Sequence, residues 1–320
     1  MLLRQLEYLA ALAHEGHFGR AAQECGVSQP ALSAGIRKLE SELGVQIVSR
    51  GQRFDGLTTE GEEVLRWAQR VLADRRDLDH RIQVMGSHLT GTLRIGAIPT
   101  ALSAASLLTG PLRADQPHLH FSLRSMNSRD IVAELDDLTL DVGMTYVDGE
   151  PLGHTRTVPL YRERYLLLTR DDGPLAALEE VTWRDAGAVP LCLLPAEMQN
   201  RRIVDGFLGE AGAHADVVVE TDTISAIFAH VAALDLASIV PQTWLFGVAL
   251  PDGLRVRPLP DPARGYHVGL VLSARRPETT LARALVEVAS RIDVQRALEH
   301  EVVRRVPTAA ALPGVPPRDG

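Results

Sequence analysis

The sequence predicts a chain of three parts: an all-α winged helix-turn-helix domain at residues 1–58, a long linker helix at 59–88, and a two-lobed α/β domain at 89–295. Three observations lead to this prediction. Two short helical segments meet at a glycine turn near the N-terminus. A long segment follows in which apolar residues recur at steps of three and four positions, and strand and helix patterns then alternate. Residues 296–320 form a C-terminal extension whose end, rich in proline, alanine and glycine, is expected to be disordered.

Length, composition and charge limit the class of protein. A chain of 320 residues, 45% of them hydrophobic, is long enough for two or three packed cores. No apolar run is long enough to cross a bilayer, and charge comes too early for a signal peptide, so we expect a cytoplasmic protein with no membrane partner. The formal net charge of −8 argues against a protein that only coats nucleic acid, but it allows one basic face on an acidic body.

A helix-turn-helix is predicted around Gly26. Ala21 and Ala22 are small enough for two helices to cross closely, and Gly26 supplies the turn between them. Ser28 is a suitable N-cap for the second helix, and Pro30 fits its first turn. This second helix would present amide, hydroxyl and guanidinium groups to a DNA groove, the alternative being an ordinary αα-hairpin.

A short β-hairpin, or wing, is predicted after this helix. Two apolar segments, 45–48 and 54–57, flank a turn that carries arginines. Arginines beside a helix-turn-helix often contact phosphate or the minor groove, and a solvated charged turn is the alternative. The predicted DNA-binding residues are Ser28, Gln29, Pro30, Ser33, Arg37, Lys38, Arg50 and Arg53.

The linker helix is predicted to begin at the threonine cap Thr58-Thr59 and to run to about Met85. A helix of about 25 residues spans nearly 40 Å, which is too long for burial within one small domain. We therefore expect it to pair with a second copy of the chain, the alternative being a lone amphipathic helix on its own domain. The predicted dimerisation residues are Val64, Val71, Leu78, Ile82 and Met85.

The α/β domain is predicted to contain two lobes. Its first lobe, about 91–160 and 266–295, has a βαβαβ pattern that predicts a parallel sheet, with helices at 100–112 and 130–138. The chain is expected to cross over near 158–161 into a second α/β lobe, about 161–265. Two lobes joined by two crossovers form a periplasmic-binding-protein-like architecture. The expected strands are 92–98, 119–124, 140–144, 165–169, 191–194, 217–220, 238–241, 254–260 and, back in the first lobe, 268–272.

The N-terminal motif closely resembles that of LysR-type transcriptional regulators, and the order of later elements extends the resemblance to about residue 295. The resemblance implies a cytoplasmic homodimer or homotetramer that binds double-stranded promoter DNA and responds to a small-molecule effector. RNA polymerase is a further candidate partner. The matching positions are Ala21-Ala22, Val27-Ser28-Gln29-Pro30-Ala31-Leu32-Ser33, Ile36, Leu39-Glu40, Leu43-Gly44 and Arg50.

The chain departs from the family pattern at several positions. Cys25 replaces a usual leucine, and Ile47-Val48 replace a usual Leu-Phe pair in the wing. Ala34-Gly35 stand where the family often has long polar side chains, which weakens the expectation of base contacts there. The usual Gly-x-Gly of the second lobe is absent, and residues 233–237 take its place.

An effector site is predicted between the lobes. Thr100 and Ser128 follow strands and open helices, and ligands of open α/β sheets bind at the carboxyl ends of strands. With neutral donors and no carboxylate expected to point inward, the site should prefer a small carboxylate or an oxyanion. The alternative is that these hydroxyls cap their own helices. The predicted effector-binding residues are Thr100, Ser103, Ser128, Thr145, Asn200 and Thr223.

The alternatives to an effector-responsive regulator have weaker support in the sequence. Cys25 and Cys192 leave open a thiol-based redox-sensing regulator, but they lie far apart and Cys192 is in an apolar strand. An enzyme or small-molecule-binding protein with an accessory DNA-binding domain is a remote alternative, because no catalytic residues, cofactor motif or metal cluster are recognised. His14 and His17 are interpreted as polar residues at a helix junction rather than metal ligands.

Overall fold

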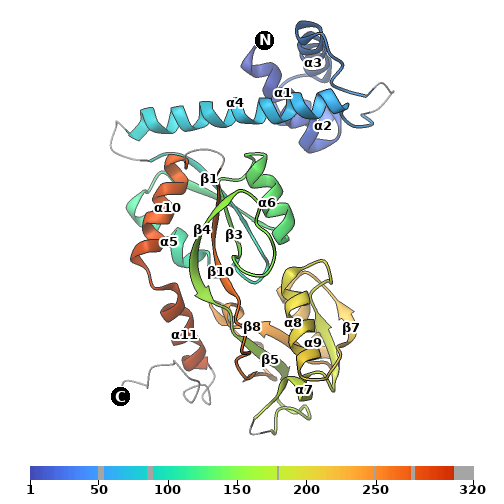
Figure 1. Ribbon diagram of the computed structural model, residues 1–320, viewed down its shortest axis with the longest axis vertical. Helices are drawn as coiled ribbons and strands as arrows, with labels where there is room; N and C mark the ends of the chain where they lie inside the picture. The colour runs from blue at the N-terminus through green and yellow to red at the C-terminus, as the bar shows by residue number, and fades with distance from the viewer. Residues whose placement is uncertain (50–53, 85–88, 179, 248, 275–277, 306–320) are drawn as a thin grey trace. The chain divides into compact units, whose positions relative to one another are not determined.

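The computed structural model describes residues 1–49, 54–84, 89–178, 180–247, 249–274 and 278–305 (Figure 1). It divides the chain into two compact units. The first unit comprises Met1–Leu89 with Asp137–Thr139, and the second comprises Thr90–Asp136 and the chain from Leu140 onward. Among the described helices, none combines the length and the apolar composition that crossing a lipid bilayer requires.

The first unit contains the predicted helix-turn-helix. Gly26 adopts a φ of +65° between two helices, which confirms the glycine turn. The Ser28 hydroxyl accepts a hydrogen bond from Ala31 N at 3.4 Å, which confirms the N-cap. The core that holds the helices together includes Leu12, Leu32 and Ile36. Its helices are α1 (Leu3–Glu15), α2 (Phe18–Glu24), α3 (Gln29–Leu43) and α4 (Thr59–Val84).

The wing and the start of α4 approach each other closely. Val48 pairs with Leu57 in the predicted hairpin, whose turn residues Arg50 and Arg53 lie outside the described residues. The Thr58 hydroxyl accepts from Gly61 N at 2.9 Å, which confirms the threonine cap. Gly61 lies against the wing backbone, because a Cβ atom at this position would be 2.1 Å from the Ile47 carbonyl oxygen.

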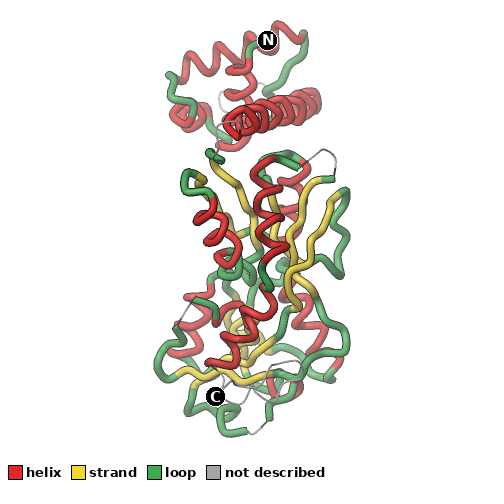
Figure 2. Tube along the Cα trace, turned by 90° about the vertical axis from the view of Figure 1, so that its left-hand side faces the viewer, coloured by secondary structure: helices red, strands yellow, loops and turns green. Residues whose placement is uncertain are grey.

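The first lobe of the second unit is a five-stranded sheet of order β2-β1-β3-β10-β4. Strands β1, β2 and β3 are parallel, as predicted, and β10 returns antiparallel between β3 and β4. Helix α6 lies on one face of this sheet, with α5 and α10 on the other (Figures 1 and 2). The bounds are β1 Gly91–Ala97, β2 Leu119–Ser125, β3 Val142–Tyr146, β4 Thr155–Arg162, β10 His267–Ser273, α5 Ser106–Asp115, α6 Ser128–Asp136 and α10 Thr280–Arg291.

The second lobe has antiparallel strands β8-β5-β9 and a parallel pair β6-β7. Its core includes Trp244, and helix α11 joins it through Val302. Helix α11 thus continues the fold into the segment predicted as an extension, while residues 306–320 lie outside the described part. The bounds are β5 Tyr165–Arg170, β6 Pro190–Leu193, β7 Asp216–Glu220, β8 Ser238–Pro241, β9 Leu254–Pro258, α7 Trp183–Ala186, α8 Gln199–Glu210, α9 Ile224–Ala233, the 3-10 turn η1 Gln242–Leu245 and α11 Val294–Arg305.

Of three local expectations, one was nearly right and two were wrong. Residues 158–161, near which the crossover was expected, belong to β4, which pairs antiparallel with β10, and the chain crosses into the second lobe just after them, between Arg162 and Tyr165. Helix α5 begins at Ser106, so Thr100 does not open a helix; its carbonyl instead accepts a hydrogen bond from the Thr243 hydroxyl. Thr145 lies within β3 rather than after it.

Candidate DNA-binding surface and effector site

The start of α3 carries the exposed polar side chains that the sequence predicted. Ser28, Gln29 and Pro30 are all exposed at this end of the helix. Farther along α3, Arg37 and Lys38 are exposed as well. One end and one side of α3 therefore offer hydroxyl, amide and cationic groups to a partner.

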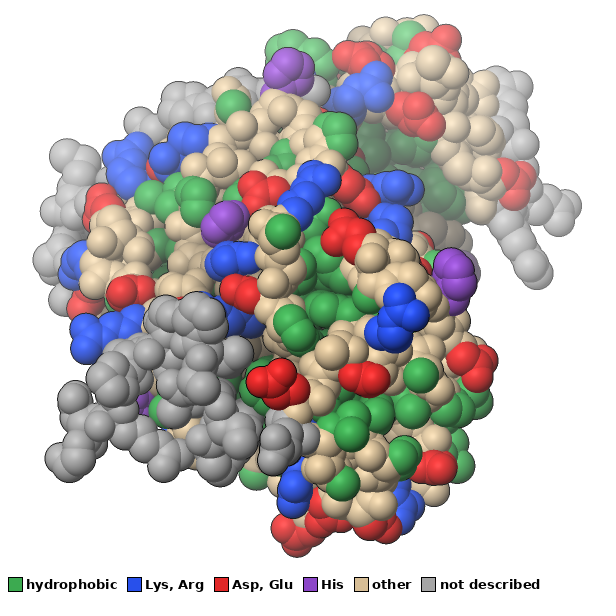
Figure 3. Space-filling model, turned by 60° about the horizontal axis from the view of Figure 1, so that its bottom comes forward, with side chains coloured by type: hydrophobic (Ala, Val, Ile, Leu, Met, Phe, Trp, Pro, Cys, Tyr) green, Lys and Arg blue, Asp and Glu red, His purple; other side chains and the backbone are tan. Residues whose placement is uncertain are grey.

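A groove separates α3 from the wing. Half-buried Ser33 and exposed Arg37 line it from the helix side, and Gln46 and Ser49 line it from the wing side. On the face drawn in Figure 3, by contrast, acidic and basic side chains are interspersed rather than gathered into one basic patch. The groove combines Ser33 and Arg37, predicted on the helix, with polar side chains of the wing that were not predicted.

Gly35 has a packing role that the sequence comparison with the family pattern did not reveal. A Cβ atom at this position would lie 2.6 Å from Cδ2 of Tyr8, whose ring is buried in the core. The neighbouring Ala34 is exposed. Glycine at position 35 therefore lets α3 approach the Tyr8 ring of α1.

An apolar face on α4 is open to solvent. Trp67 is 61% exposed and Leu78 is 56% exposed, whereas Val64 and Val71 are half-buried against their own domain. Trp67 was not among the predicted dimerisation residues, although it follows Val64 by one helical step of three. The side chain of Ile82 and the whole of Met85 lie outside the described residues. A cavity of about 310 Å³ on this face is lined by Met1, Leu6, Leu43, Glu63, Val64, Trp67, Ala68 and Val71.

Four of the six predicted effector-binding residues are buried in the second unit. Thr100, Ser128, Thr145 and Asn200 are each no more than 6% exposed. The Thr145 hydroxyl donates to Ser128 Oγ at 2.9 Å, so these two predicted residues contact each other. The other lobe contributes Asn200, whose Nδ2 donates to the Tyr146 hydroxyl of the first lobe at 2.9 Å.

The remaining two predicted residues lie in different surroundings. Ser103 is half-buried, and its hydroxyl donates to the Thr243 carbonyl at 2.6 Å, which links the two lobes. Thr223 is exposed at the start of α9, and its hydroxyl donates to Asp222 at 3.0 Å. Its hydroxyl is therefore occupied locally, at the surface of the second lobe.

A buried acid, Glu163, lies among these residues, and the sequence analysis missed it. Its Oε2 accepts hydrogen bonds from the Tyr146 hydroxyl, from the Tyr165 hydroxyl at 2.9 Å and from Asn200 Nδ2 at 3.3 Å. Burial raises the pKa of Glu163, and the hydrogen bonds from Tyr146 and Tyr165 oppose that shift. The expectation that no carboxylate points into the site was wrong, because the connection between β4 and β5 buries Glu163.

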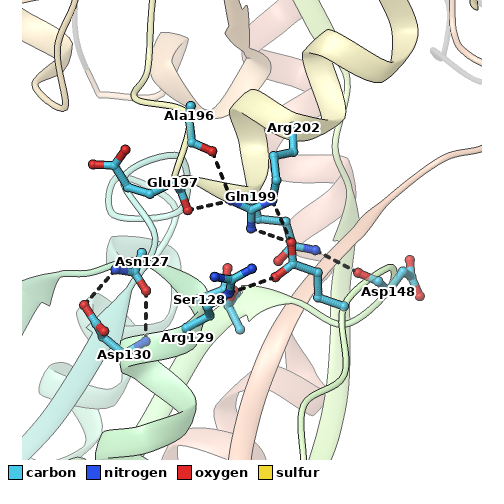
Figure 4. A network of polar contacts seen from close by, with 11 residues as sticks. Asn127, Ser128, Arg129, Asp130, Asp148, Ala196, Glu197, Gln199 and Arg202 are labelled. Carbon is cyan, nitrogen blue, oxygen red and sulfur yellow. Dashed lines mark hydrogen bonds and ion pairs between the residues drawn. The ribbon is translucent and has the colours of Figure 1, made fainter.

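The two lobes also meet in a network of polar contacts near the N-termini of α6 and α8 (Figure 4). From α8, Arg202 Nε donates to Glu150 Oε1 at 2.8 Å, and Gln199 Nε2 donates to the Asp148 carbonyl at 3.1 Å. From α6, Arg129 Nε lies 3.9 Å from Glu150 Oε2. Glu150 and Asp148 belong to the segment after β3, so this segment connects the lobes.

Neither cysteine has the surroundings of a reactive thiol. Burial, followed by the charges of Glu24 and Glu7, raises the pKa of Cys25. Burial raises the pKa of Cys192 to about 11. Because the thiolate is the reactive form, both shifts reduce reactivity near neutral pH, and the two thiols belong to different units.

His17 is a polar cap at the junction of α1 and α2. His17 Nδ1 accepts from Gly19 N at 3.0 Å and caps α2, as expected. Ligand atoms of His14, Glu15 and Glu24 lie within 4.8 Å of one another, but Glu15 is already engaged by Arg20 Nε at 2.8 Å. The Glu15 carboxylate is therefore accounted for by its ion pair with Arg20.

Two family models match this chain. One, described as a bacterial regulatory helix-turn-helix protein of the lysR family, matches residues 3–62, and the other, described as a LysR substrate binding domain, matches residues 86–292. The DNA-binding transcriptional dual regulator OxyR of Escherichia coli K12 is 32% identical over 295 residues, covering 92% of this chain and 96% of OxyR. The hydrogen peroxide-inducible genes activator of Haemophilus influenzae is 28% identical over 293 residues, covering 91% of this chain and 96% of that protein.

Solved structures show the same architecture. A full-length OxyR variant from Pseudomonas aeruginosa superposes with a TM-score of 0.72 at 28% identity, covering 92% of this chain and 97% of that one. Full-length CbnR in complex with its target DNA superposes with a TM-score of 0.67 at 22% identity, covering 91% of this chain and 99% of the CbnR chain. The winged helix-turn-helix, linker helix and two-lobed domain are therefore the arrangement of known full-length regulators.

Proposed function

Because this chain belongs to the LysR family of transcriptional regulators, we propose that it binds a promoter operator as an oligomer and that a small molecule held between its lobes controls transcription. It would act in the cytoplasm, by binding rather than by catalysis. The observation that carries the proposal is the exposed polar end of α3 beside the wing groove, in a chain whose second unit buries hydroxyl and amide groups between two lobes.

Substitutions on α3 test the DNA-binding part of this proposal. Gln29→Ala is expected to relax discrimination among operator bases by about 1–3 kcal/mol, the value of a bidentate amide contact to a base edge. Arg37→Ala is also expected to weaken operator binding. Fluorescence anisotropy with operator and with single-base variants would measure both. A Gln29→Ala protein with unchanged affinity and specificity would contradict the assignment of α3 as the recognition helix.

Lys38 provides an independent readout because it is the only lysine in the sequence. Its amine is exposed on α3, so operator DNA is expected to slow its acetylation, as seen by mass spectrometry. A control with DNA of unrelated sequence at the same concentration should slow it less. Equal acetylation with and without operator would show that this part of α3 does not approach DNA.

The oligomer is proposed from the apolar face of α4. Predicted residues Val64, Val71 and Leu78 lie along this helix, together with exposed Trp67. An oligomer would place one helix-turn-helix on each half-site of an operator.

A redox-sensing function is the second candidate, because relatives named hydrogen peroxide-inducible genes activators match over most of the chain. The pKa values of Cys25 and Cys192, both raised by burial, speak against it. We expect hydrogen peroxide to leave operator affinity unchanged. A peroxide response in the wild type that disappears in a Cys25→Ala, Cys192→Ala double variant would establish the redox function instead.

A further inference from the structure

We propose that Arg202, assisted by Arg129, is the anion-binding end of the effector site, and that Glu150 occupies it as an internal carboxylate until an anionic effector displaces it. This inference rests on the proposed function, because it assigns a chemical class to the proposed effector. It also places the anion at the α6 and α8 N-termini rather than beside Thr100 and Asn200, which surround the buried Glu163 carboxyl.

Arg202 is held ready to bind an oxyanion. Its Nη1 donates to the carbonyl oxygens of Ala196 at 3.1 Å and Glu197 at 2.6 Å, which orients the guanidinium from within its own lobe. Its Nε and Nη2 both donate to Glu150 Oε1. This edge of the guanidinium is the fork that matches a carboxylate, and it would stay in place if Glu150 moved away.

Glu150 reaches Arg202 from a segment anchored in the first lobe. Asp148 Oδ2 accepts from His267 N at 2.8 Å, and Gly149, with a φ of +91°, turns the chain toward α8. Because Glu150 Oε2 also lies 3.9 Å from Arg129 Nε, one carboxylate connects arginines of both lobes. A bound carboxylate effector would make the same connection.

The network lies beside the buried hydroxyls. Ser128, which contacts Thr145, immediately precedes Arg129, and Asn200, which contacts Glu163, is two residues before Arg202. The N-termini of α6 and α8 therefore both contribute to this region, and their dipoles favour a negative group there (Figure 4).

A buried acceptor in the network indicates a second feature of the effector. Gln199 is 4% exposed, and its Oε1 has no hydrogen-bond partner among the described residues. A donor on the effector would satisfy this oxygen, since leaving a buried polar atom without a partner is unfavourable. The geometry thus points to a small carboxylate that also bears a hydroxyl or amino group.

The test uses full-length protein and lactate, a small hydroxy acid, as the probe, with chloride at matched ionic strength as the reference. Removing the internal competitor with Glu150→Gln is expected to tighten lactate binding about tenfold in a thermal-shift titration, because a larger fraction of molecules then has a free Arg202. Adding Arg202→Gln to that variant should abolish the gain. Arg202→Lys, which keeps the charge without the fork, should retain only part of it.

Glu197→Gln is the matched control, because Glu197 contacts Arg202 through its backbone oxygen rather than its carboxylate. A Glu150→Gln protein that binds lactate no more tightly than the Glu197→Gln protein would overturn the inference, as would a gain that survives Arg202→Gln. These outcomes leave the proposed function standing if the wild type binds its operator. Failure of the wild type to bind operator DNA would instead overturn the proposed function.

Discussion

Replacing Trp67 and Leu78 together by aspartate is expected to dissociate the oligomer and to abolish tight binding to an operator with two half-sites. Both side chains are more than half exposed on α4 in the single chain. Burying each against a second copy would contribute about 1.5–3 kcal/mol, so losing both should weaken association by at least about 100-fold. Two aspartates on the same face would add the cost of burying charge.

Sedimentation equilibrium would measure the association, and anisotropy would measure operator affinity. Leu234→Asp is the matched control, because Leu234 is also an exposed leucine, 44% accessible, but lies at the end of α9 in the second lobe. This control should associate like the wild type. A Trp67→Asp, Leu78→Asp protein that still forms the wild-type oligomer would show that another surface joins the chains.

Gly61→Ala is expected to destabilise the DNA-binding domain by about 3 kcal/mol or more and to eliminate operator binding. Its added Cβ would lie 2.1 Å from the Ile47 carbonyl oxygen and 2.9 Å from the Ile47 carbonyl carbon. Both atoms belong to the backbone, so the start of α4 would have to move away from the wing. The hydrogen bond from Thr58 N to Ile47 O, 2.9 Å long, would be strained by this movement.

Amide hydrogen exchange would locate this loss of stability, because residues of the first unit should lose protection. Gly206→Ala is the control. Gly206 is exposed within α8, and a Cβ atom there would meet nothing within 4 Å, so alanine should stabilise that helix by about 0.5–1 kcal/mol. Wild-type stability in the Gly61→Ala protein would contradict the close approach of α4 to the wing.

The exposed polar end of α3 was largely predictable because its signals are local. Gly26 adopts the positive φ that the turn required. The Ser28 hydroxyl caps α3 by accepting a hydrogen bond from the backbone N–H of Ala31, three residues later. A helix fixes which of its faces each residue occupies, so Gln29 and Arg37 could be placed from the apolar repeat alone. Tyr8 lies on a different helix, and its contact with Gly35 gave no local signal.

The effector region was predictable only in part because its contacts join distant parts of the chain. The hydrogen bond that the Thr100 carbonyl accepts comes from Thr243, 143 residues later. Glu163 accepts a hydrogen bond from Asn200, which lies 37 residues later in the sequence. Glu150 accepts one from Arg202, which lies 52 residues later. Periodicity can place a residue at the end of a strand, but it cannot show which side chain from another lobe will face it.

The sequence by itself therefore determined the family, the three-part architecture and the exposed polar end of α3, since caps, turns and helical spacing act over a few residues. The tertiary structure alone decided that Glu163 points inward, that Glu150 lies between Arg129 and Arg202, and that Gly61 contacts the wing. These three features arise where separate elements pack together. Their energies depend on pairs of groups that only the folded chain brings within hydrogen-bonding or van der Waals distance.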